Sequence, residues 1–337
     1  MQKSKSDKPI TQPTGKFVIS LDFELMWGVR DRKSIESYGK NIAAVKKVLP
    51  KMVSAFDKHQ IKGTWATVGF LFAHNKQALT PFIPEHKPAY SDINLSPYAN
   101  YLKGLESNES EDVYHFAASL IDILKQHPNQ EVASHTFSHY YCLEPGQTEE
   151  DFEADIKAAI EIAKAQGVEL HSLVFPRNQF NETYLKIINK HGIDCYRGNE
   201  KVWFQNAAKR EDEGMLKRGV RLLDSYLNVS GHHCFSLEEL SAQRPINIPA
   251  SRFLRPFSSK LKLFESLRLK RILKGMTHAA KTNTVFHLWW HPHNFGSNQT
   301  ENFKVLDRIL NHYKKLNTLY SFESVSMNEI AKMVIEK

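Results

Sequence analysis

Two histidines four residues apart, His135 and His139, stand in the segment EVASHTFSHYY, directly after a short apolar stretch. Two neutral imidazoles at this spacing can turn toward one point and hold a divalent metal ion. A catalytic zinc site needs about three protein ligands and one open position for water. Taken alone, the pair is also compatible with structural histidines that hydrogen-bond to the backbone, so other residues have to decide between these interpretations.

A third metal ligand is available in the segment FVISLDFELMWG near the start of the chain. Asp22 and Glu24 lie on the same side of an expected strand, because side chains alternate along a strand with a period of two residues. Burying a carboxylate in an apolar strand is costly unless it is paired or bound to a metal, which favours a functional role for Asp22. Glu24 is either a metal ligand or an ion-pair partner of Arg30 or Arg177.

A second pair of histidines, His291 and His293, ends another apolar stretch in the segment TVFHLWWHPHNFG. Arg177 follows a further strand pattern, HSLVFPRN. An acidic pair, a histidine pair and a late histidine, each at the end of an expected strand, together indicate a metal-dependent hydrolase.

Strand and helix patterns alternate along nearly the whole chain. We expect strands at residues 17–26, 63–72, 131–133, 171–178, 193–198, 221–229 and 284–290, and helices at 41–59, 113–127, 149–166, 261–276 and 301–316. This order predicts a mainly parallel sheet that is closed or nearly closed. In such barrels the reacting groups gather at the carboxyl ends of the strands, which is where the candidate residues fall.

The chain length of 337 residues suits one α/β barrel with insertions. We expect a polar N-terminal tail at 1–15, a single barrel domain at 16–337, and insertions near 74–110 and 199–219. The segment from His74 to Ser110 is too long for a plain connection, which favours a functional loop or lid.

The net charge is +8, and much of the excess lies between Arg252 and Lys281, where a basic amphipathic helix is expected. Its charges either face water or meet an anionic lipid surface or a substrate phosphate. The sequence lacks the interleaved aromatic and basic residues of a groove that binds single-stranded nucleic acid, so we expect no nucleic-acid partner.

The three cysteines form no C-x-x-C motif, and neither a signal peptide nor a membrane span is evident. We therefore expect a cytoplasmic protein, with peripheral contact at the inner membrane face as an alternative to a purely solvated surface.

Taken in order, these motifs resemble those of the polysaccharide deacetylase family, the NodB-homology group of carbohydrate esterases. The likeness runs from about residue 17 to residue 295. The segment SLDFE stands where that family has T-F-D-D, GTWATVGF is similar to its second-strand motif, SHTFSH matches H-[ST]-x-x-H, and FHLWWHPHNF is similar to its last motif.

The resemblance implies a deformed (β/α)7 barrel that removes an acetyl group with the help of one divalent metal, zinc being favoured. Glu24, His135 and His139 would hold the metal, and Asp22 would be the catalytic base. His291 would protonate the departing group, with His293 as a competitor for that role.

The chain departs from the family pattern at three of these motifs, one of which is the last motif with its second histidine, His293. Its acids are separated by Phe23 rather than adjacent, so the metal carboxylate is Glu24 or Asp22. The family places an arginine before a proline to orient the base. Here Arg177 follows Pro176 and is the candidate for that role.

The remaining candidates are aromatic and histidine side chains that could contact a sugar ring. Trp27, Tyr140, Trp290 and His293 are the predicted substrate contacts. Trp27 and Trp290 could equally belong to the core.

Three functions are compatible with these residues. The leading hypothesis is removal of an acetyl group from an N-acetylated sugar in cell-surface polysaccharide metabolism, with a nucleotide- or lipid-linked precursor as the substrate. A second is hydrolysis of a small amide or ureide in the same barrel. A third is a glycan-binding pseudoenzyme that has kept the barrel without the chemistry.

Overall fold

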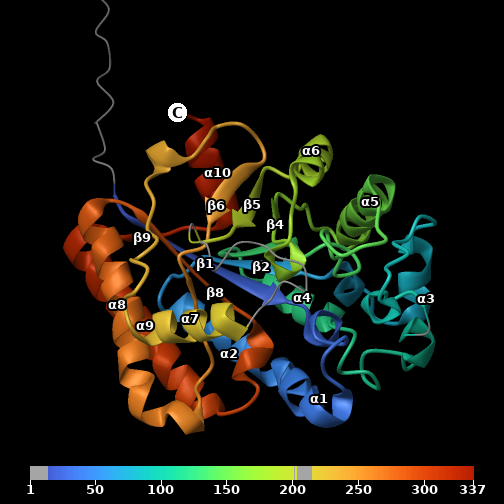
Figure 1. Cartoon of the computed structure of the whole chain (residues 1–337), viewed down its shortest axis with the longest axis horizontal. Coiled ribbons are helices and arrows are strands. Elements are labelled where there is room, and N and C mark those ends of the chain that lie inside the picture. The colour runs from blue at the N-terminus through green and yellow to red at the C-terminus, as the bar shows by residue number, and fades with distance from the viewer. Residues whose placement is uncertain (1–13, 100, 201, 203–214) are drawn as a thin grey trace, which may run out of the picture.

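The computed structural model describes residues 14–99, 101–200, 202 and 215–337, and its strands form one parallel sheet surrounded by helices (Figure 1). The strands are β1 (Lys16–Phe23), β2 (Gly63–Thr67), β3 (Gln130–Ser134), β4 (Ser172–Leu173), β5 (Cys195–Gly198), β6 (Ile246–Pro249), β7 (Arg252–Phe253), β8 (Val285–Trp290) and β9 (Glu323–Ser324). The α-helices are α1 (Ile35–Ala43), α2 (Val45–Lys58), α3 (Lys76–Leu79), α4 (Ala118–Lys125), α5 (Glu149–Ala165), α6 (Glu182–Lys190), α7 (Met215–Tyr226), α8 (Glu265–Thr282), α9 (Gln299–Tyr320) and α10 (Met327–Ile335). Short 3-10 helices that matter for the site are η1 (Leu25–Gly28), η2 (Gly69–Phe72), η6 (Pro176–Asn178), η10 (Ser259–Phe264) and η11 (Pro292–Phe295).

The sheet closes on itself through one bent segment, residues 246–253. Strand order along the sheet is β6-β5-β4-β3-β2-β1-β8-β7, with β9 beside β1. β6 pairs with β5, and three residues later β7 pairs with β8. Between them, the backbone N–H of Ala250 donates to Gly198 of β5 and that of Ser251 to His287 of β8. If β6 and β7 are taken as one bent strand, the ring has seven strands, which confirms the predicted (β/α)7 barrel.

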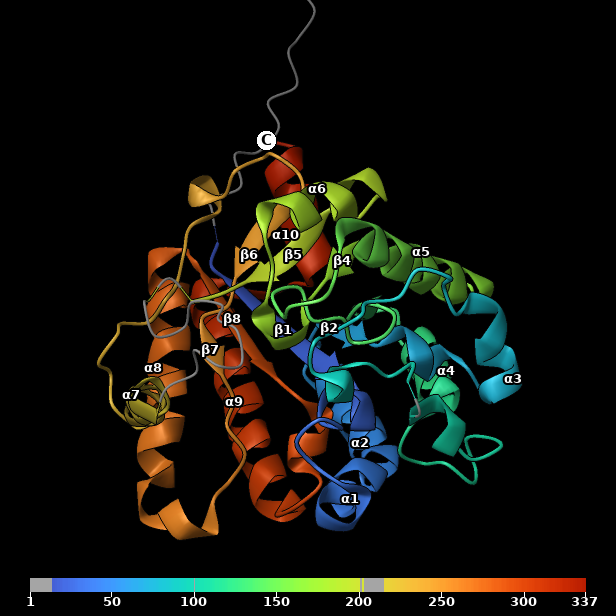
Figure 2. The ribbon, with the colours of Figure 1, turned by 45° about the vertical axis from the view of Figure 1, so that its right-hand side comes forward.

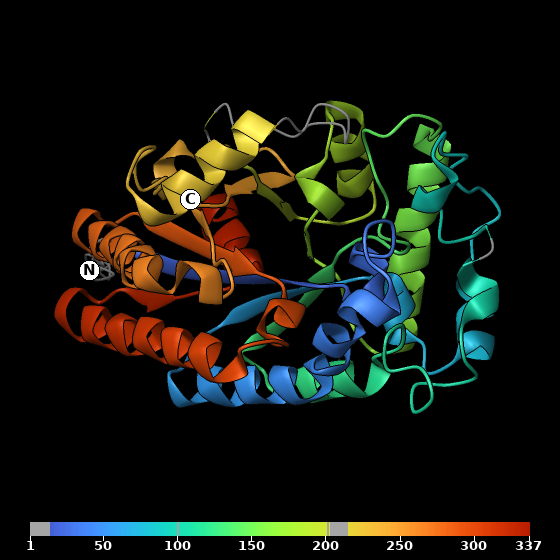
Figure 3. The same cartoon turned by 60° about the horizontal axis from the view of Figure 1, so that its bottom comes forward.

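Side-chain alternation along β1 separates the interior of the barrel from its outer layer. Phe17, Ile19 and Leu21 pack in the large apolar cluster between strands and helices. Val18 instead joins a smaller cluster with residues of β5, β6 and α10, and the alternation places Asp22 on this same inner side. Figures 2 and 3 show the helices around the outside of the strands. Asp22 therefore faces into the barrel at the carboxyl end of its strand.

One expected strand is wrong. Residues 221–229 were expected to be extended, but Arg221–Tyr226 belong to α7, which packs on α8. A short apolar run does not distinguish a strand from a helix by its pattern alone. The paired leucines at 222 and 223 lie on this helix.

The segment expected as an insertion at 74–110 holds α3 and several 3-10 turns rather than one long helix or strand. Residues 1–13 of the expected tail, and most of the insertion expected near 199–219, lie outside the described residues. None of the helices in the described part of the chain is long and apolar enough to cross a membrane.

Candidate metal and catalytic site

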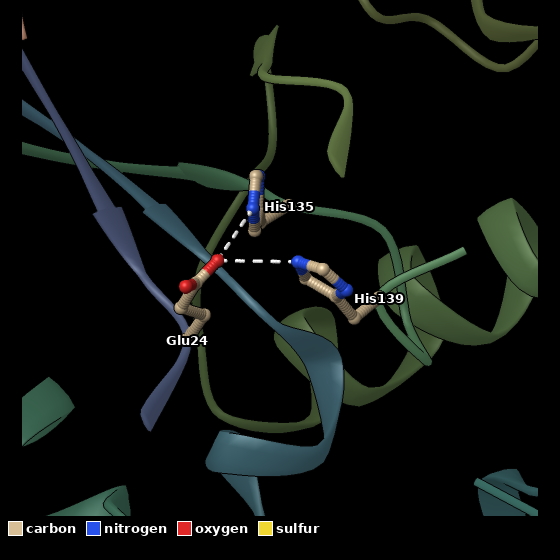
Figure 4. A group of neighbouring side chains, drawn as sticks. All are labelled: Glu24, His135 and His139. Atoms are coloured by element: carbon tan, nitrogen blue, oxygen red, sulfur yellow. Dashed lines mark hydrogen bonds and ion pairs between the residues drawn. The ribbon is translucent and has the colours of Figure 1, made fainter. Parts of the chain in front are cut away.

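Glu24, His135 and His139 converge at the carboxyl end of the barrel (Figure 4). Glu24 Oε2 lies 3.2 Å from His135 Nε2 and 3.1 Å from His139 Nε2. The three ligand atoms all lie within 4.8 Å of one another, and all three side chains are buried. The structure therefore brings together the three residues predicted to hold the metal.

The barrel strands position two of these ligands directly. Glu24 follows the last residue of β1, and His135 follows the last residue of β3. Both strands pair with β2 in parallel, so their carboxyl ends lie at the same end of the barrel. The backbone N–H of His135 donates to Thr67 of β2, which extends the strand pairing by one residue.

His139 lies on a loop, residues 135–139, that is fixed by a residue of helix α5. The Asp155 carboxylate accepts hydrogen bonds from the backbone N–H of Phe137 at 2.7 Å and of Ser138 at 3.1 Å. The Ser138 hydroxyl also donates to Asp155. Burial raises the pKa of Asp155 to about 6. A buried carboxylate with these donors is a rigid anchor for the loop.

Unusual backbone angles gather around the site. Of the ten non-glycine residues with positive φ in the described ranges, five are Leu25, Thr136, His139, Arg177 and Asn178. Such conformations cost energy and persist where the surrounding structure enforces them, which is common at functional sites.

Gly28 makes room for the Glu24 carboxylate. A Cβ atom placed on Gly28 would lie 1.9 Å from Cδ of Glu24 and 2.1 Å from its Oε1. Only glycine fits beneath the carboxylate as it is placed here.

The protonation pattern of His135 fits a cation between these side chains. Its Nδ1 lies 2.8 Å from the carbonyl oxygen of Val174 and can only donate there, so in neutral His135 the Nε2 lone pair faces Glu24. Burial lowers the pKa of His139 to about 4, so this imidazole is neutral. Burial alone would raise the pKa of Glu24, but the neighbouring histidines, with the charge of His291 first among them, hold it well below its usual value. Two imidazole nitrogens and one carboxylate are a donor set suited to a divalent ion.

Asp22 is paired with an arginine, but not with the predicted one. The Arg197 guanidinium of β5 donates to both oxygens of Asp22, at 2.6 and 2.8 Å. Burial alone would raise the pKa of Asp22, and Arg197 lowers it below its usual value. The expectation that Arg177 orients Asp22 is wrong, because Arg177 pairs with Asp31 and, at 3.3 Å, with Glu144.

Arg197 is itself held by a polar layer inside the barrel. It donates to the Ser20 hydroxyl at 3.1 Å and to Asn178 Oδ1 at 2.9 Å. Ser20 in turn lies 2.8 Å from His287 Nε2, and burial lowers the pKa of His287 to about 3. These contacts fix the plane in which Arg197 meets Asp22.

His291 faces both acids. Its Nε2 lies 3.7 Å from Asp22 Oδ2 and 3.6 Å from Glu24 Oε1, and its side chain is 22% exposed. His293 stacks behind it with ring centroids 5.0 Å apart and is buried, which lowers its pKa to about 3. The structure thus places His291, and not His293, between the acids and the outside.

A family model described as "Polysaccharide deacetylase" matches residues 12–196, which is more than half of the chain. The chain belongs to the polysaccharide deacetylase family. Comparison with curated proteins finds no match.

Solved structures share the fold of this polysaccharide deacetylase family member at low identity. A polysaccharide deacetylase from Mycobacterium smegmatis is 12% identical, with a TM-score of 0.57 over 98% of this chain and 95% of that one. One from Pseudomonas aeruginosa PAO1 is 8% identical, with a TM-score of 0.54 over 94% and 89%. An allantoinase is 8% identical, with a TM-score of 0.54 over 98% and 93%. At these identities the likeness concerns the fold alone.

Three of the predicted substrate contacts are wrong for this family member. Trp27 and Trp290 are completely buried, and Tyr140 is 1% exposed, so none offers a ring face to a sugar. The indole N–H of Trp27 donates to the His115 carbonyl inside the core. His293 is also buried, beneath His291.

A pocket of about 220 Å³ opens beside His291 and Arg197 instead. Trp289 and Phe253 line it, and both rings contact His291. The Arg197 guanidinium lies 4.1 Å from the centroid of Trp289. Arg221, Arg252 and Arg255 also line the pocket.

Arg197 is the residue of the candidate site that the sequence motifs missed. Its signal was present in the segment IDCYRG, where a charged residue alternates with Cys195 on the inner side of a buried strand. A buried guanidinium needs a partner, by the same argument that singled out Asp22.

Proposed function

We propose that the protein is a divalent-metal-dependent hydrolase that removes the acetyl group from an acetamido sugar carried on a phosphate-bearing precursor. The single observation that carries the proposal is the convergence of Glu24, His135 and His139 beside the Asp22–Arg197 pair and His291. Membership of the polysaccharide deacetylase family supports the reaction class.

The metal would be held by Glu24, His135 and His139, whose mixed nitrogen and oxygen donors favour zinc. A divalent ion bound there supplies Lewis acidity, which activates water and polarises an acetyl carbonyl. The low pKa of His139 keeps its imidazole neutral, and Gly28 leaves the Glu24 carboxylate in reach of both histidines.

Asp22 and His291 would move the protons. Arg197 keeps Asp22 ionised, so the carboxylate is ready to accept a proton from the attacking water. His291 is the most exposed of the converging groups, and an imidazolium there is flanked by two carboxylates. It would donate its Nε2 proton to the departing sugar amine as the C–N bond breaks.

The pocket beside these groups supports a substrate that carries a phosphate. Arg255 lines it, and its guanidinium has no hydrogen-bond or ion-pair partner in the described ranges. Trp289 offers part of an aromatic face to a sugar ring in the same pocket. An arginine that has no partner, next to a partly exposed indole, suits a phosphorylated sugar.

The experiment joins metal analysis to acetate release. The purified protein should hold about one divalent ion per chain and release acetate from UDP-linked or lipid-linked acetamido sugars. The double variant His135→Ala with His139→Ala should lose both metal and activity while its circular dichroism stays unchanged. Two exposed histidines, His74→Ala with His86→Ala, are the matched control. Full metal occupancy in the first variant would show that the site is misplaced.

Two other functions are separated by the same assay. Release of ammonia, or opening of a ureide ring, in place of acetate would identify an amide or ureide hydrolase. Metal binding and glycan binding without any turnover would identify a pseudoenzyme. The complete set of groups, with Asp22 paired and His291 accessible, favours an active enzyme over the latter.

The variant Arg255→Gln tests whether the substrate carries a phosphate that binds in this pocket. This variant should raise KM for a phosphorylated acetamido sugar and leave KM for the free sugar unchanged, because only the former has an anion to pair with Arg255. Arg308→Gln, an exposed arginine on α9, is the control of equal charge. Equal KM values for the phosphorylated sugar in both variants would remove the phosphate from the proposal.

A further inference from the structure

The exposed apolar side chains of the protein are concentrated on one face. Among the residues that the structure describes, more than half of the exposed large hydrophobic side chains come from residues 222–229 and 263–267. We call this the α7–α8 face, and its main members are Leu222, Leu223, Leu227, Leu263, Phe264 and Leu267. Leu263 is 89% exposed. A contiguous apolar face of this kind usually marks an interaction site.

Two neighbouring elements build the face. Helix α7 packs beside α8, which continues from η10 (Figure 2). A groove of about 370 Å³ runs between them and is lined almost entirely by apolar side chains, including Tyr226 and Leu261. The face is therefore continuous across both elements.

Exposed lysines lie on the same two elements, η10 and α8, as part of this face. Lys260, Lys262, Lys270 and Lys274 are exposed, and none has an ion-pair partner in the described part of the chain. The acidic residues of 215–229 and 259–281 are Asp224 and Glu265, and both are used internally. Asp224 pairs with Arg252 and, at 3.2 Å, with Arg271, and Glu265 pairs with Arg268 at 2.5 Å.

The arginines of α8 therefore do not belong to the exposed charge. Arg268 and Arg271 are buried, which corrects the expectation that the charges of this helix all face water. Among the described residues of α8, the exposed positive charge is carried by lysines.

We infer that the α7–α8 face binds an anionic lipid bilayer. Exposed leucine and phenylalanine side chains would enter the interface, and these lysines would meet the anionic headgroups. A second copy of the chain fits less well, since a two-fold contact through this face would bring the lysines of both copies together.

The face also has a fixed relation to the catalytic pocket. Helix α7 contributes Arg221 and Ser225 to the pocket beside His291, while its neighbouring residues Leu222 and Leu223 form part of the face. Docking through α7 and α8 would thus hold the pocket close to the bilayer. The binding itself does not depend on the proposed deacetylase activity.

The experiment is flotation of the full-length protein with vesicles, in low and high sodium chloride. Vesicles of equal parts phosphatidylcholine and phosphatidylglycerol should bind the protein, and vesicles of phosphatidylcholine alone should not. High salt should release it, because exposed charges are screened. Lys262→Gln with Lys270→Gln should weaken binding roughly 25-fold, about fivefold for each lysine. Leu263→Ser with Phe264→Ser should weaken binding at low salt, because fewer apolar side chains then enter the interface.

Matched controls exist on helix α9. Leu319 and Tyr320 are exposed apolar residues outside the face, and Lys314 and Lys315 are exposed lysines. Leu319→Ser with Tyr320→Ser, and Lys314→Gln with Lys315→Gln, should bind vesicles like the wild type. Acetate release from a soluble acetamido sugar should be the same in all four variants, which separates this inference from the proposed function.

Three results would overturn the inference. The first is that the wild type does not float with the anionic vesicles. The second is that the lysine and leucine–phenylalanine variants of the α7–α8 face float as well as the α9 controls. The third is that light scattering shows a dimer that Leu263→Ser with Phe264→Ser dissociates, in which case a second copy covers the face.

Discussion

Asp22 and Glu24 are only two residues apart, yet the barrel gives them different neighbours. Arg197 occupies both oxygens of Asp22, and two histidines face one oxygen of Glu24. A carboxylate held on both oxygens by a guanidinium is unsuited to a metal, whereas one that faces two imidazole nitrogens is suited to it. The sequence left open which acid is the metal ligand, and these partners favour Glu24.

Arg197→Gln should move the acid limb of the pH profile of kcat/KM to higher pH. Arg197 lowers the pKa of Asp22, and without it burial raises this pKa, so the carboxylate becomes protonated at higher pH and the base is lost earlier on acidification. Arg177→Gln should leave the acid limb in place, because Arg177 contacts Asp31 and Glu144. A shift caused by Arg177→Gln alone would contradict the pairing described here.

His291→Ala should slow acetate release by ~10²–10⁴-fold, the range for a positioned general acid or base. The loss should be greatest for substrates with a poor leaving group, since these depend most on protonation. His293→Ala should cost less, because His293 is buried behind His291. Steady-state rates with amide and activated ester substrates check this, and a larger effect at His293 would reverse the two roles.

Residue type and order were sufficient to predict that Glu24, His135 and His139 converge, and that Asp22 and His291 lie beside them. They were insufficient for Arg177 and for the aromatic contacts, because a motif does not say which way a ring or guanidinium turns. Trp27 and Trp290 are adjacent to site residues in sequence but face the core, whereas Trp289, on the other side of β8, faces the pocket. Neighbouring side chains of a strand point to opposite sides, so Trp289 and Trp290 face the pocket and the core respectively.

At the scale of elements, the loop 135–139 depends on helix α5. Asp155→Ala should weaken metal binding by roughly 10–100-fold, as is typical when the support of a ligand is removed, although Asp155 is not a ligand itself. Asp151→Ala is the matched control on the same helix, since Asp151 caps the helix start at Thr148 instead. Metal titrations of both variants check this, and equal affinities would show that the loop holds its shape without Asp155.

Helix α7 shows where a local pattern fails. Its sequence VRLLDSY has two adjacent leucines that indicate a strand, but Asp224 is turned inward to Arg252 and Arg271 while the leucines stay exposed. Ion pairs with distant parts of the chain decide this orientation, and no window of neighbouring residues contains them. The alternating strands and helices of the barrel depend on local periodicity and were predicted more closely.

At the scale of the whole molecule, the metal should stabilise the fold. Its ligands come from segments that follow β1 and β3, so an ion between them ties separate parts of the barrel together. At a free metal concentration about 100 times its Kd, the free energy of unfolding should rise by about 2.7 kcal/mol. Denaturant titrations with and without metal check this. His135→Ala with His139→Ala should show no such rise, and an equal rise in that variant would place the ion elsewhere.

Gly28 gives a way to recognise which relatives of this chain could carry the same centre. A methyl group at this position overlaps the Glu24 carboxylate, and the overlap is relieved by swinging that flexible side chain away from the histidines. A relative that has the same glutamate but a larger residue four positions later would keep every ligand residue, and we expect it to hold the metal more weakly. Gly28→Ala should therefore lower metal affinity while all three ligand residues remain in the chain, which metal titration checks.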